Sequence, residues 1–184
     1  MIDEDIIIFD NFLTKSYHKE LLNLSTSGFF KWGFVNNISY AEDKETLGYY
    51  GLGHNVFDAN IQAWVSNHQE LFKPFSYQVM DIANCEKVIR FRLDMTLYNK
   101  DNLIHDAHID FPNQTNNVSC VYYVNETDGV TIIFNETNLK GNYTIKKRIP
   151  PKLNRLLMFK GKFAHTGCSP SKHNTRILIN SNYN

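Results

Sequence analysis

One stretch of the chain restricts its fold more than any other, because its side chains alternate between apolar and polar over ten residues. Residues 89–98 read Ile-Arg-Phe-Arg-Leu-Asp-Met-Thr-Leu-Tyr. A period of two places the apolar set on one face of an extended strand and the polar set on the other. The stretch therefore predicts a strand with an apolar face and a polar face, and the polar face carries Arg92, Asp94 and Tyr98.

Further segments carry the β-branched and aromatic residues typical of strands, with Asn, Asp, Gly and Pro between them. These segments span residues 118–124, 131–134, 143–146, 155–159 and 175–179. Many short strands at this spacing indicate a β-sandwich or jelly roll. A parallel α/β sheet is disfavoured, because no helical segment of about ten or more residues separates these strands.

The first half of the chain shows apolar residues at helical spacing. The pattern predicts a helix over residues 14–24, capped by its first residue. A second apolar stripe covers residues 58–84, with an interruption at Pro74 and with His68 as a packing residue. Residues 180–184 read as a polar tail.

The charge balance argues against partners that bind through bulk charge. The 184 residues hold 19 Lys plus Arg and 19 Asp plus Glu, so the net charge is zero and neither nucleic acid nor an anionic membrane is expected. The three cysteines form no Cys-x-x-Cys pair, which disfavours a disulfide framework and a thiolate zinc site. With an acidic N-terminus and no apolar run of about 20 residues, we expect a cytoplasmic protein without leader or membrane span.

A possible metal site stands out within the β-rich half. His108 and Asp110 are two residues apart, so in an extended segment their side chains leave the same face, and His165 follows 55 residues after Asp110. Two imidazoles and one carboxylate form a facial ligand set that leaves coordination positions open, which is what oxygen chemistry at Fe(II) requires. A His-x-Asp triplet alone is a common surface pattern, so its surroundings must decide.

Two groups that can bind a carboxylate flank these residues: Arg176 follows His165 by eleven residues, and Tyr98 precedes His108 by ten. The order Tyr98, His108, Asp110, His165, Arg176 resembles the 2-oxoglutarate and Fe(II)-dependent dioxygenases, in particular the prolyl-4-hydroxylase-like branch of small bacterial and phage members. The sequence around these residues also resembles that of the family, at residues 122–134, 154–159 and 163–167. In all, the resemblance covers roughly residues 88–180.

The resemblance implies an α+β, mainly β fold: a double-stranded β-helix (jelly roll) with N-terminal helices packed on one sheet. It implies a single domain over residues 1–184, in which residues 1–86 form a helical support region and residues 87–184 the jelly-roll catalytic core.

The resemblance also implies the activity. His108, Asp110 and His165 would bind Fe(II), and 2-oxoglutarate, the cosubstrate, would chelate the metal. Arg176 and Tyr98 would bind the far carboxylate of 2-oxoglutarate. With O2, such an enzyme hydroxylates a C–H bond of a protein side chain, prolyl residues among the candidates, or of a small metabolite, and releases succinate and CO2.

The chain departs from the family pattern at three positions. A turn that commonly carries two glycines has Gly129 followed by Val130, and Leu178 stands where some members place a serine for the cosubstrate. Asn182 stands where nucleic-acid demethylases of the superfamily carry a second arginine, which with zero net charge makes that branch a poor match.

Two other classes stay open from the residues alone: a non-catalytic jelly-roll binding module, and a cupin-like metalloenzyme that does not use 2-oxoglutarate. Neither needs an anchor for a dicarboxylate, so Arg176 and Tyr98 discriminate. The sequence leaves the substrate and the oligomeric state undetermined. Residues 36–56 and 99–107, which would select the substrate, show no recognisable binding chemistry.

Overall fold

The computed structural model describes residues 2–38, 50–114 and 116–184. The elements in chain order are β1 (Ile6–Asp10), α1 (Lys15–Thr26), β2 (Gly33–Val35), β3 (Gly51–Asp58), β4 (Ala63–Trp64), α2 (Gln69–Ala83), β5 (Val88–Leu97), β6 (Val118–Tyr123), β7 (Thr131–Phe134), β8 (Ile145–Ile149), β9 (Arg155–Lys160), β10 (His165–Gly167) and β11 (Thr175–Tyr183). Neither helix of this described part is long and apolar enough to cross a membrane.

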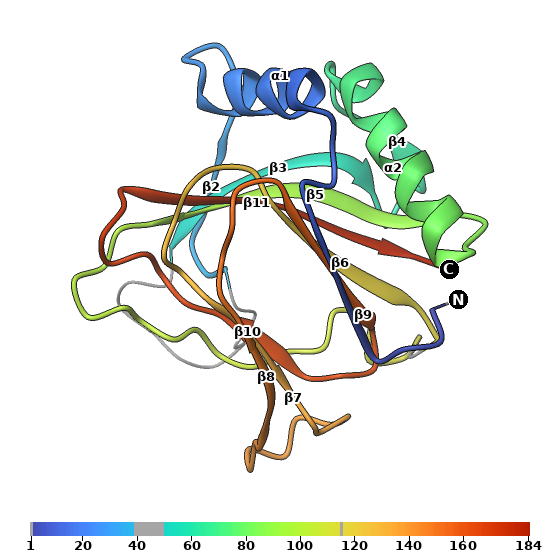
Figure 1. Cartoon of the computed structure of the whole chain (residues 1–184), viewed down its shortest axis with the longest axis vertical. Coiled ribbons are helices and arrows are strands. Elements are labelled where there is room, and N and C mark those ends of the chain that lie inside the picture. The colour runs from blue at the N-terminus through green and yellow to red at the C-terminus, as the bar shows by residue number, and fades with distance from the viewer. Residues whose placement is uncertain (1, 39–49, 115) are drawn as a thin grey trace.

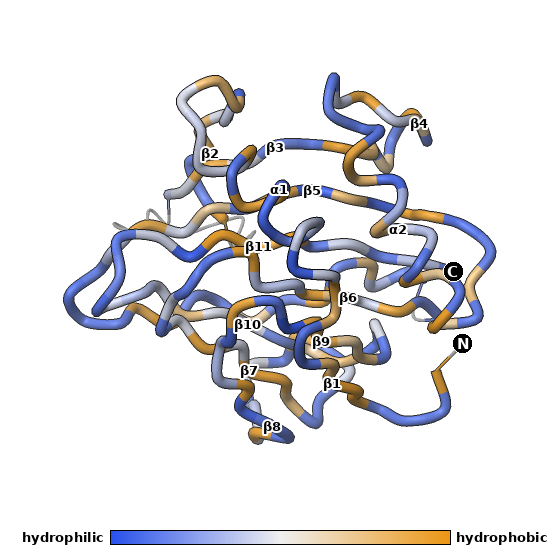
Figure 2. The backbone as a smooth tube through the Cα atoms, turned by 45° about the horizontal axis from the view of Figure 1, so that its top comes forward, coloured by the Kyte–Doolittle hydropathy of each residue, from blue (hydrophilic) through white to orange (hydrophobic). Residues whose placement is uncertain are grey.

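The strands form two antiparallel sheets. The larger has the order β1-β9-β6-β11-β5-β3-β2, with β4 attached to β3, and the smaller has the order β10-β7-β8. Both helices lie on the outer side of the larger sheet, and the smaller sheet lies below it (Figure 1). Hydrophilic residues dominate the connections at the edge of the molecule (Figure 2). This arrangement confirms the mainly β jelly roll with helices packed on one sheet.

The alternation along β5 gives the larger sheet two different faces, one packed against the helices and one facing the interior of the molecule. Phe91 is fully buried on the helix side, where its ring centroid lies 5.7 Å from that of Phe72 and 5.6 Å from that of Phe75. Arg90 and Arg92, on the opposite face, line a cavity on the inner side of the sheet. The polar face of β5 is therefore the wall of an interior site.

The first helix agrees with its prediction, but the second begins later than predicted. In α1, Thr14 is the N-cap, and its hydroxyl accepts a hydrogen bond from the Tyr17 N–H. For the second helix, the sequence prediction is wrong over residues 58–68. The Asp58 carboxylate accepts hydrogen bonds from the N–H groups of Asn60 and Ile61 and so forms a turn there. That turn joins β3 to β4, so the apolar residues at helical spacing belong to a hairpin.

The predicted interruption at Pro74 is also wrong, since α2 continues through it. The hydroxyl of Tyr17, a residue of α1, bridges the turn of α2 that contains Pro74. Tyr17 Oη donates to the Leu71 carbonyl at 2.6 Å and accepts from the Phe75 N–H at 3.0 Å. The Tyr17 side chain thereby satisfies two backbone groups that flank the proline.

The predicted polar tail is a strand. Its residues belong to β11, which runs to Tyr183 and lies between β5 and β6 in the larger sheet. The amide nitrogens of Asn180 and Asn182 find acceptors inside the molecule; that of Asn182 donates to Ser119 Oγ at 2.9 Å.

We predict that Tyr17→Phe lowers the free energy of unfolding by about 1–2 kcal/mol, because it leaves the Leu71 carbonyl and the Phe75 N–H without their bridging partner. Urea unfolding followed by circular dichroism measures the change. Tyr77→Phe is the matched control, since the Tyr77 ring belongs to α2, the helix that Tyr17 bridges, and is exposed. Equal stabilities of the two variants would contradict the bridging role.

Candidate active site

The two predicted metal-binding histidines lie side by side because their backbones pair. His108, in the connection between β5 and β6, forms an antiparallel bridge with His165 of β10, with N–H to carbonyl distances of 2.9 Å in both directions. Their ring centroids are 4.4 Å apart. The Asp110 carboxylate completes the group, at 3.7 Å from Nε2 of each histidine, and the donor atoms of all three side chains lie within 4.8 Å of one another.

Each histidine ring has a backbone carbonyl beside its Nδ1 atom. The distances are 3.4 Å from His108 to the Asp106 carbonyl and 3.2 Å from His165 to the Phe163 carbonyl. A proton on Nδ1 that is donated to the carbonyl leaves the Nε2 lone pair directed at the centre of the group. Burial, together with the proximity of His165, lowers the pKa of His108 to about 3, so this ring is neutral at pH 7. The residues fit a divalent metal with a two-histidine, one-carboxylate ligand set.

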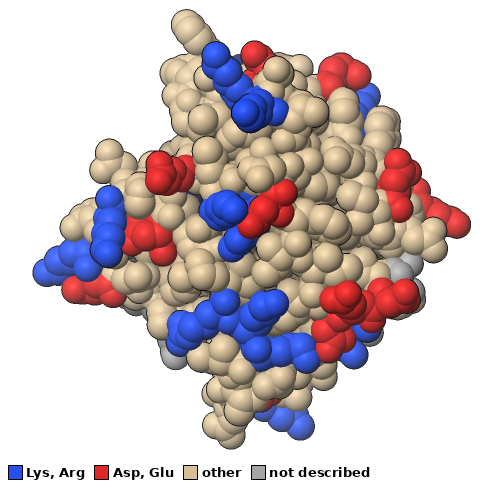
Figure 3. All heavy atoms as spheres, viewed as in Figure 1, with Lys and Arg blue, Asp and Glu red and all other residues tan. Residues whose placement is uncertain are grey.

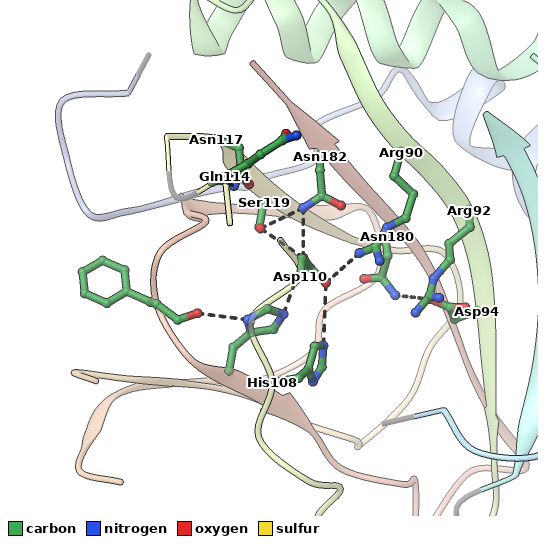
Figure 4. A network of polar contacts seen from close by, with 12 residues as sticks. Arg90, Arg92, Asp94, His108, Asp110, Gln114, Asn117, Ser119, Asn180 and Asn182 are labelled. Atoms are coloured by element: carbon green, nitrogen blue, oxygen red, sulfur yellow. Dashed lines mark hydrogen bonds and ion pairs between the residues drawn. The ribbon is translucent and has the colours of Figure 1, made fainter. Parts of the chain in front are cut away.

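The Asp110 carboxylate is buried at the centre of a polar network (Figure 4). Arg90 Nη2 donates to Oδ1 at 2.6 Å, while Ser119 Oγ and Asn182 Nδ2 donate to Oδ2 at 3.1 and 2.9 Å. Burial alone would raise the pKa of Asp110, but Arg90, the two histidines and Asn182 hold it well below its usual range. The carboxylate is therefore ionised and oriented before any cation binds.

Arg176 lies at the other end of the same cavity and is only 5% exposed. Its Nε donates to the Gly129 carbonyl at 2.9 Å and its Nη2 to Thr131 Oγ1 at 2.8 Å. The side chain also needs the space that two glycines leave: a Cβ on Gly129 would lie 2.6 Å from Arg176 Cδ, and one on Gly167 would lie 2.9 Å from Nη1. Within the described residues no acidic side chain forms an ion pair with Arg176, so its charge is buried among neutral partners.

The structure does not bring Tyr98 to this cavity. Strand β5 ends at Leu97, where the chain turns away, and the Tyr98 N–H donates to the Asn174 carbonyl. Its side chain is 56% exposed and does not line the cavity. A different tyrosine lies near Arg176: Tyr123 is fully buried, its hydroxyl is 2.6 Å from Thr131 Oγ1, and its ring centroid is 5.8 Å from the guanidinium carbon of Arg176.

Other polar residues of β5 and β11 line the cavity as well. Arg92 and Asp94 form the ion pair that their shared face suggests, with 2.9 Å between Nε and Oδ2. The Asn180 amide, assigned to the tail by the sequence, donates to the same carboxylate. The sequence did not identify Arg90, Ser119 and Asn182 as site residues. Of the three, only Arg90 could have been found, because it lies on the polar face predicted for residues 89–98.

A second cavity, of about 390 Å³, shares Arg90, Arg92, His108 and Asp110 with the first. It continues along residues 55–60 and 109–112 and does not reach Arg176. The two cavities thus meet at the histidine and aspartate residues, one leading to Arg176 and the other away from it. Of the predicted substrate-selecting segment 36–56, residues 39–49 lie outside the described residues.

The turn before Arg176 is held by one carboxylate. Asp128 accepts hydrogen bonds from the N–H groups of Ser171 and Lys172, at 3.0–3.2 Å, and lies 3.0 Å from His173 Nδ1. Burial would raise the pKa of Asp128, but these hydrogen bonds, that of His173 first, lower it overall. The contacts connect the chain before Gly129 to the start of β11 and so help to place Arg176.

A jelly roll that holds two histidines, one carboxylate and a buried arginine in a single cavity is the architecture of a 2-oxoglutarate-dependent oxygenase. Residues 94–184, which contain all of these side chains, match the family described as the 2OG-Fe(II) oxygenase superfamily, and this part of the chain belongs to it. The protein is therefore an oxygenase of the class that uses Fe(II), 2-oxoglutarate and O2. No curated protein matches the sequence.

Solved structures share the fold over nearly the whole chain. A prolyl hydroxylase from Trichoplax adhaerens, in complex with a peptide fragment of the hypoxia inducible factor oxygen degradation domain, is 19% identical with a TM-score of 0.66, covering 98% of this chain and 84% of its own. A Pseudomonas putida prolyl-4-hydroxylase is 13% identical with a TM-score of 0.59, covering 98% and 92%. The epimerase SnoN from nogalamycin biosynthesis, described as non-heme and alpha-ketoglutarate-dependent, is 9% identical with a TM-score of 0.66, covering 98% and 78%.

We predict that Asp128→Asn lowers the free energy of unfolding at pH 7 by about 1–2 kcal/mol, because the amide loses the charge and one acceptor. The folded-state pKa of Asp128 is below its unfolded value of about 4, so its contribution is present above that pH and is lost as the pH falls further. Urea unfolding at a series of pH values should show the two proteins converging below pH of about 4. Asp101→Asn, at an exposed carboxylate, is the control; a constant Asp128→Asn deficit down to low pH would contradict the assignment.

Proposed function

We propose that this protein hydroxylates a C–H bond of a protein side chain, such as a prolyl residue, or of a small metabolite, with conversion of 2-oxoglutarate to succinate and CO2. The observation that carries the proposal is the buried Arg176 guanidinium, whose partners in the described part of the chain are all neutral and which lies in the same cavity as His108, Asp110 and His165. A buried cation of this kind is stabilised by an anionic ligand, and a dicarboxylate can bind it and reach the metal ligands at the same time.

In this proposal each residue has a distinct task. His108, Asp110 and His165 hold Fe(II), and the neutral ring of His108 supplies a lone pair without loss of a proton. Arg176 pairs with the distal carboxylate of 2-oxoglutarate, while Gly129 and Gly167 leave the guanidinium room to lie against the wall. When bound, the iron supplies the activation of O2 that oxidises an unactivated C–H bond.

The family resemblance implies a contact between Tyr98 and 2-oxoglutarate, but the exposed Tyr98 ring would have to turn inward to make it. We therefore assign this role to Tyr123, whose buried hydroxyl is linked to Arg176 through Thr131, a residue of the cavity wall. Burial raises the pKa of Tyr123, so its hydroxyl keeps its proton and can donate it in a hydrogen bond to a carboxylate.

The substrate belongs in the 390 Å³ cavity, which opens onto His108 and Asp110 from the side away from Arg176. Among the similar structures, one is bound to a peptide and another is an epimerase from nogalamycin biosynthesis, so the fold accommodates both a peptide and a small-molecule pathway. On the face seen in Figure 3, cationic and anionic side chains lie interspersed, in keeping with a partner other than nucleic acid. We also propose a cytoplasmic location, which suits three free cysteines.

The decisive experiment is an anaerobic titration of the Fe(II)-loaded protein with 2-oxoglutarate. We expect the weak visible charge-transfer band of the metal chelate to appear and saturate. His165→Ala should lose the band and succinate formation, because the imidazole is a ligand; the apo variant, checked by circular dichroism, should remain folded. Absence of the band at saturating 2-oxoglutarate would instead favour the non-catalytic or cupin-like alternatives.

We predict that Arg176→Met raises the KM for 2-oxoglutarate by about 100-fold, because the variant loses a desolvated charge pair with the distal carboxylate. Succinate release at varied 2-oxoglutarate concentration measures this KM. Fe(II) affinity serves as the internal control and should match that of the wild-type protein, since Arg176 contacts none of the three metal-binding residues. An unchanged KM would show that the dicarboxylate binds elsewhere.

A further inference from the structure

The hydrogen bonds of Asp110 divide its two carboxylate oxygens into different roles. Each carboxylate oxygen can accept about two hydrogen bonds or ligand bonds. Oδ2 accepts from both Ser119 and Asn182, which fills its capacity. Among the described residues, Oδ1 accepts a hydrogen bond from Arg90 alone, so one of its lone pairs is left over for a cation.

Arg90 is held in place from a second side. Its guanidinium carbon lies 5.1 Å from the ring centroid of Phe111, the residue directly after Asp110. The side chain is 14% exposed and lines both cavities, so it forms part of the wall where they meet. A buried guanidinium fixed by a ring and a carboxylate holds that carboxylate in one orientation.

We propose that Arg90 is a positioning residue for the metal: together with Ser119 and Asn182 it fixes Asp110 so that this carboxylate binds the metal through Oδ1 alone. The inference rests on the metal site of the proposed function but not on the use of 2-oxoglutarate. Two effects of Arg90 oppose each other, since its charge repels a divalent cation while its hydrogen bond orients the ligand. Because the carboxylate is buried and would otherwise have to be ordered by the metal, orientation is the larger effect.

The neighbouring arginine provides a matched control. Arg92 lies two residues away on the same face of β5 and lines the same two cavities, but it forms an ion pair with Asp94 and not with Asp110. Substitution of Arg92 removes the same charge from the same wall and leaves the hydrogen bonds of Asp110 in place. A difference between the two variants therefore reports the contact with Asp110.

The test is Co(II) binding to the metal-free full-length protein, with affinity measured by competition with a chromophoric chelator and ligand geometry by the visible d–d bands. We expect Arg90→Met to weaken Co(II) binding by about 10- to 100-fold and to change the bands, as loss of an outer-sphere partner does. Arg90→Lys, which keeps a charged donor, should recover much of the affinity. Arg92→Met should bind as the wild-type protein does, and thermal unfolding of each metal-free variant shows that the fold is intact.

Equal or tighter Co(II) binding by Arg90→Met, with unchanged bands, would overturn the positioning role. If Arg90→Met does not fold, Arg90→Gln takes its place: weaker binding supports the role and wild-type binding overturns it. Failure of the wild-type protein to bind Co(II) would overturn the metal site itself. A wild-type protein that binds Co(II) but gives no 2-oxoglutarate band would overturn the proposed function and leave the role of Arg90 to be decided by the variants.

Discussion

The burial of one ionised carboxylate is the constraint on which the rest of this structure depends. Asp110 lies beside the imidazoles of His108 and His165, and without compensation its charge would be expensive to remove from water. Arg90, Ser119 and Asn182 provide that compensation from β5, β6 and β11, three adjacent strands of the larger sheet. The sheet must therefore be assembled in the correct register before the carboxylate can be buried at low cost.

The cavity contains a charge of the opposite sign at its far end, and the same strands provide it. Alternate residues of β11 face the cavity, so that this one strand contributes Arg176, Asn180 and Asn182, while its other face packs against the helices. In the proposed function, Asp110 binds the metal at one end of the cavity, and Arg176, which pairs with no acid of the described residues, binds the far end of an elongated anion. That orientation would leave the second cavity, which shares His108 and Asp110 with the first, for the substrate.

The sequence predicted those features that depend on local patterning. The strict alternation of residues 89–98 located β5, and the order of the titratable residues located the histidines, Asp110 and Arg176. It failed where a side-chain turn or a tertiary contact overrides the apolar periodicity. The stripe that starts at Asp58 has helical spacing throughout, yet the Asx-type turn at Asp58 makes its first part a hairpin, and only residues 69–83 form the helix. The Asn-rich end of β11 has low strand propensity, but pairing on both sides and the demand of Asp110 for donors keep it extended. The exposure of Tyr98 likewise depends on where the chain leaves the sheet.

The central place of β11 also bears on how the protein can be made. Residues 175–183 insert between β5 and β6, which lie about 50 to 90 residues earlier in the sequence. Until the ribosome has released β11, each of these two strands therefore has an unpaired edge on the side that β11 will occupy. Nascent chains that stall before this point would expose two strand edges with unpaired backbone N–H and C=O groups, to which other polypeptides can pair. Strand β11, which follows β5 and β6 in the chain, thus both completes the active site and ends the period in which their facing edges are unpaired.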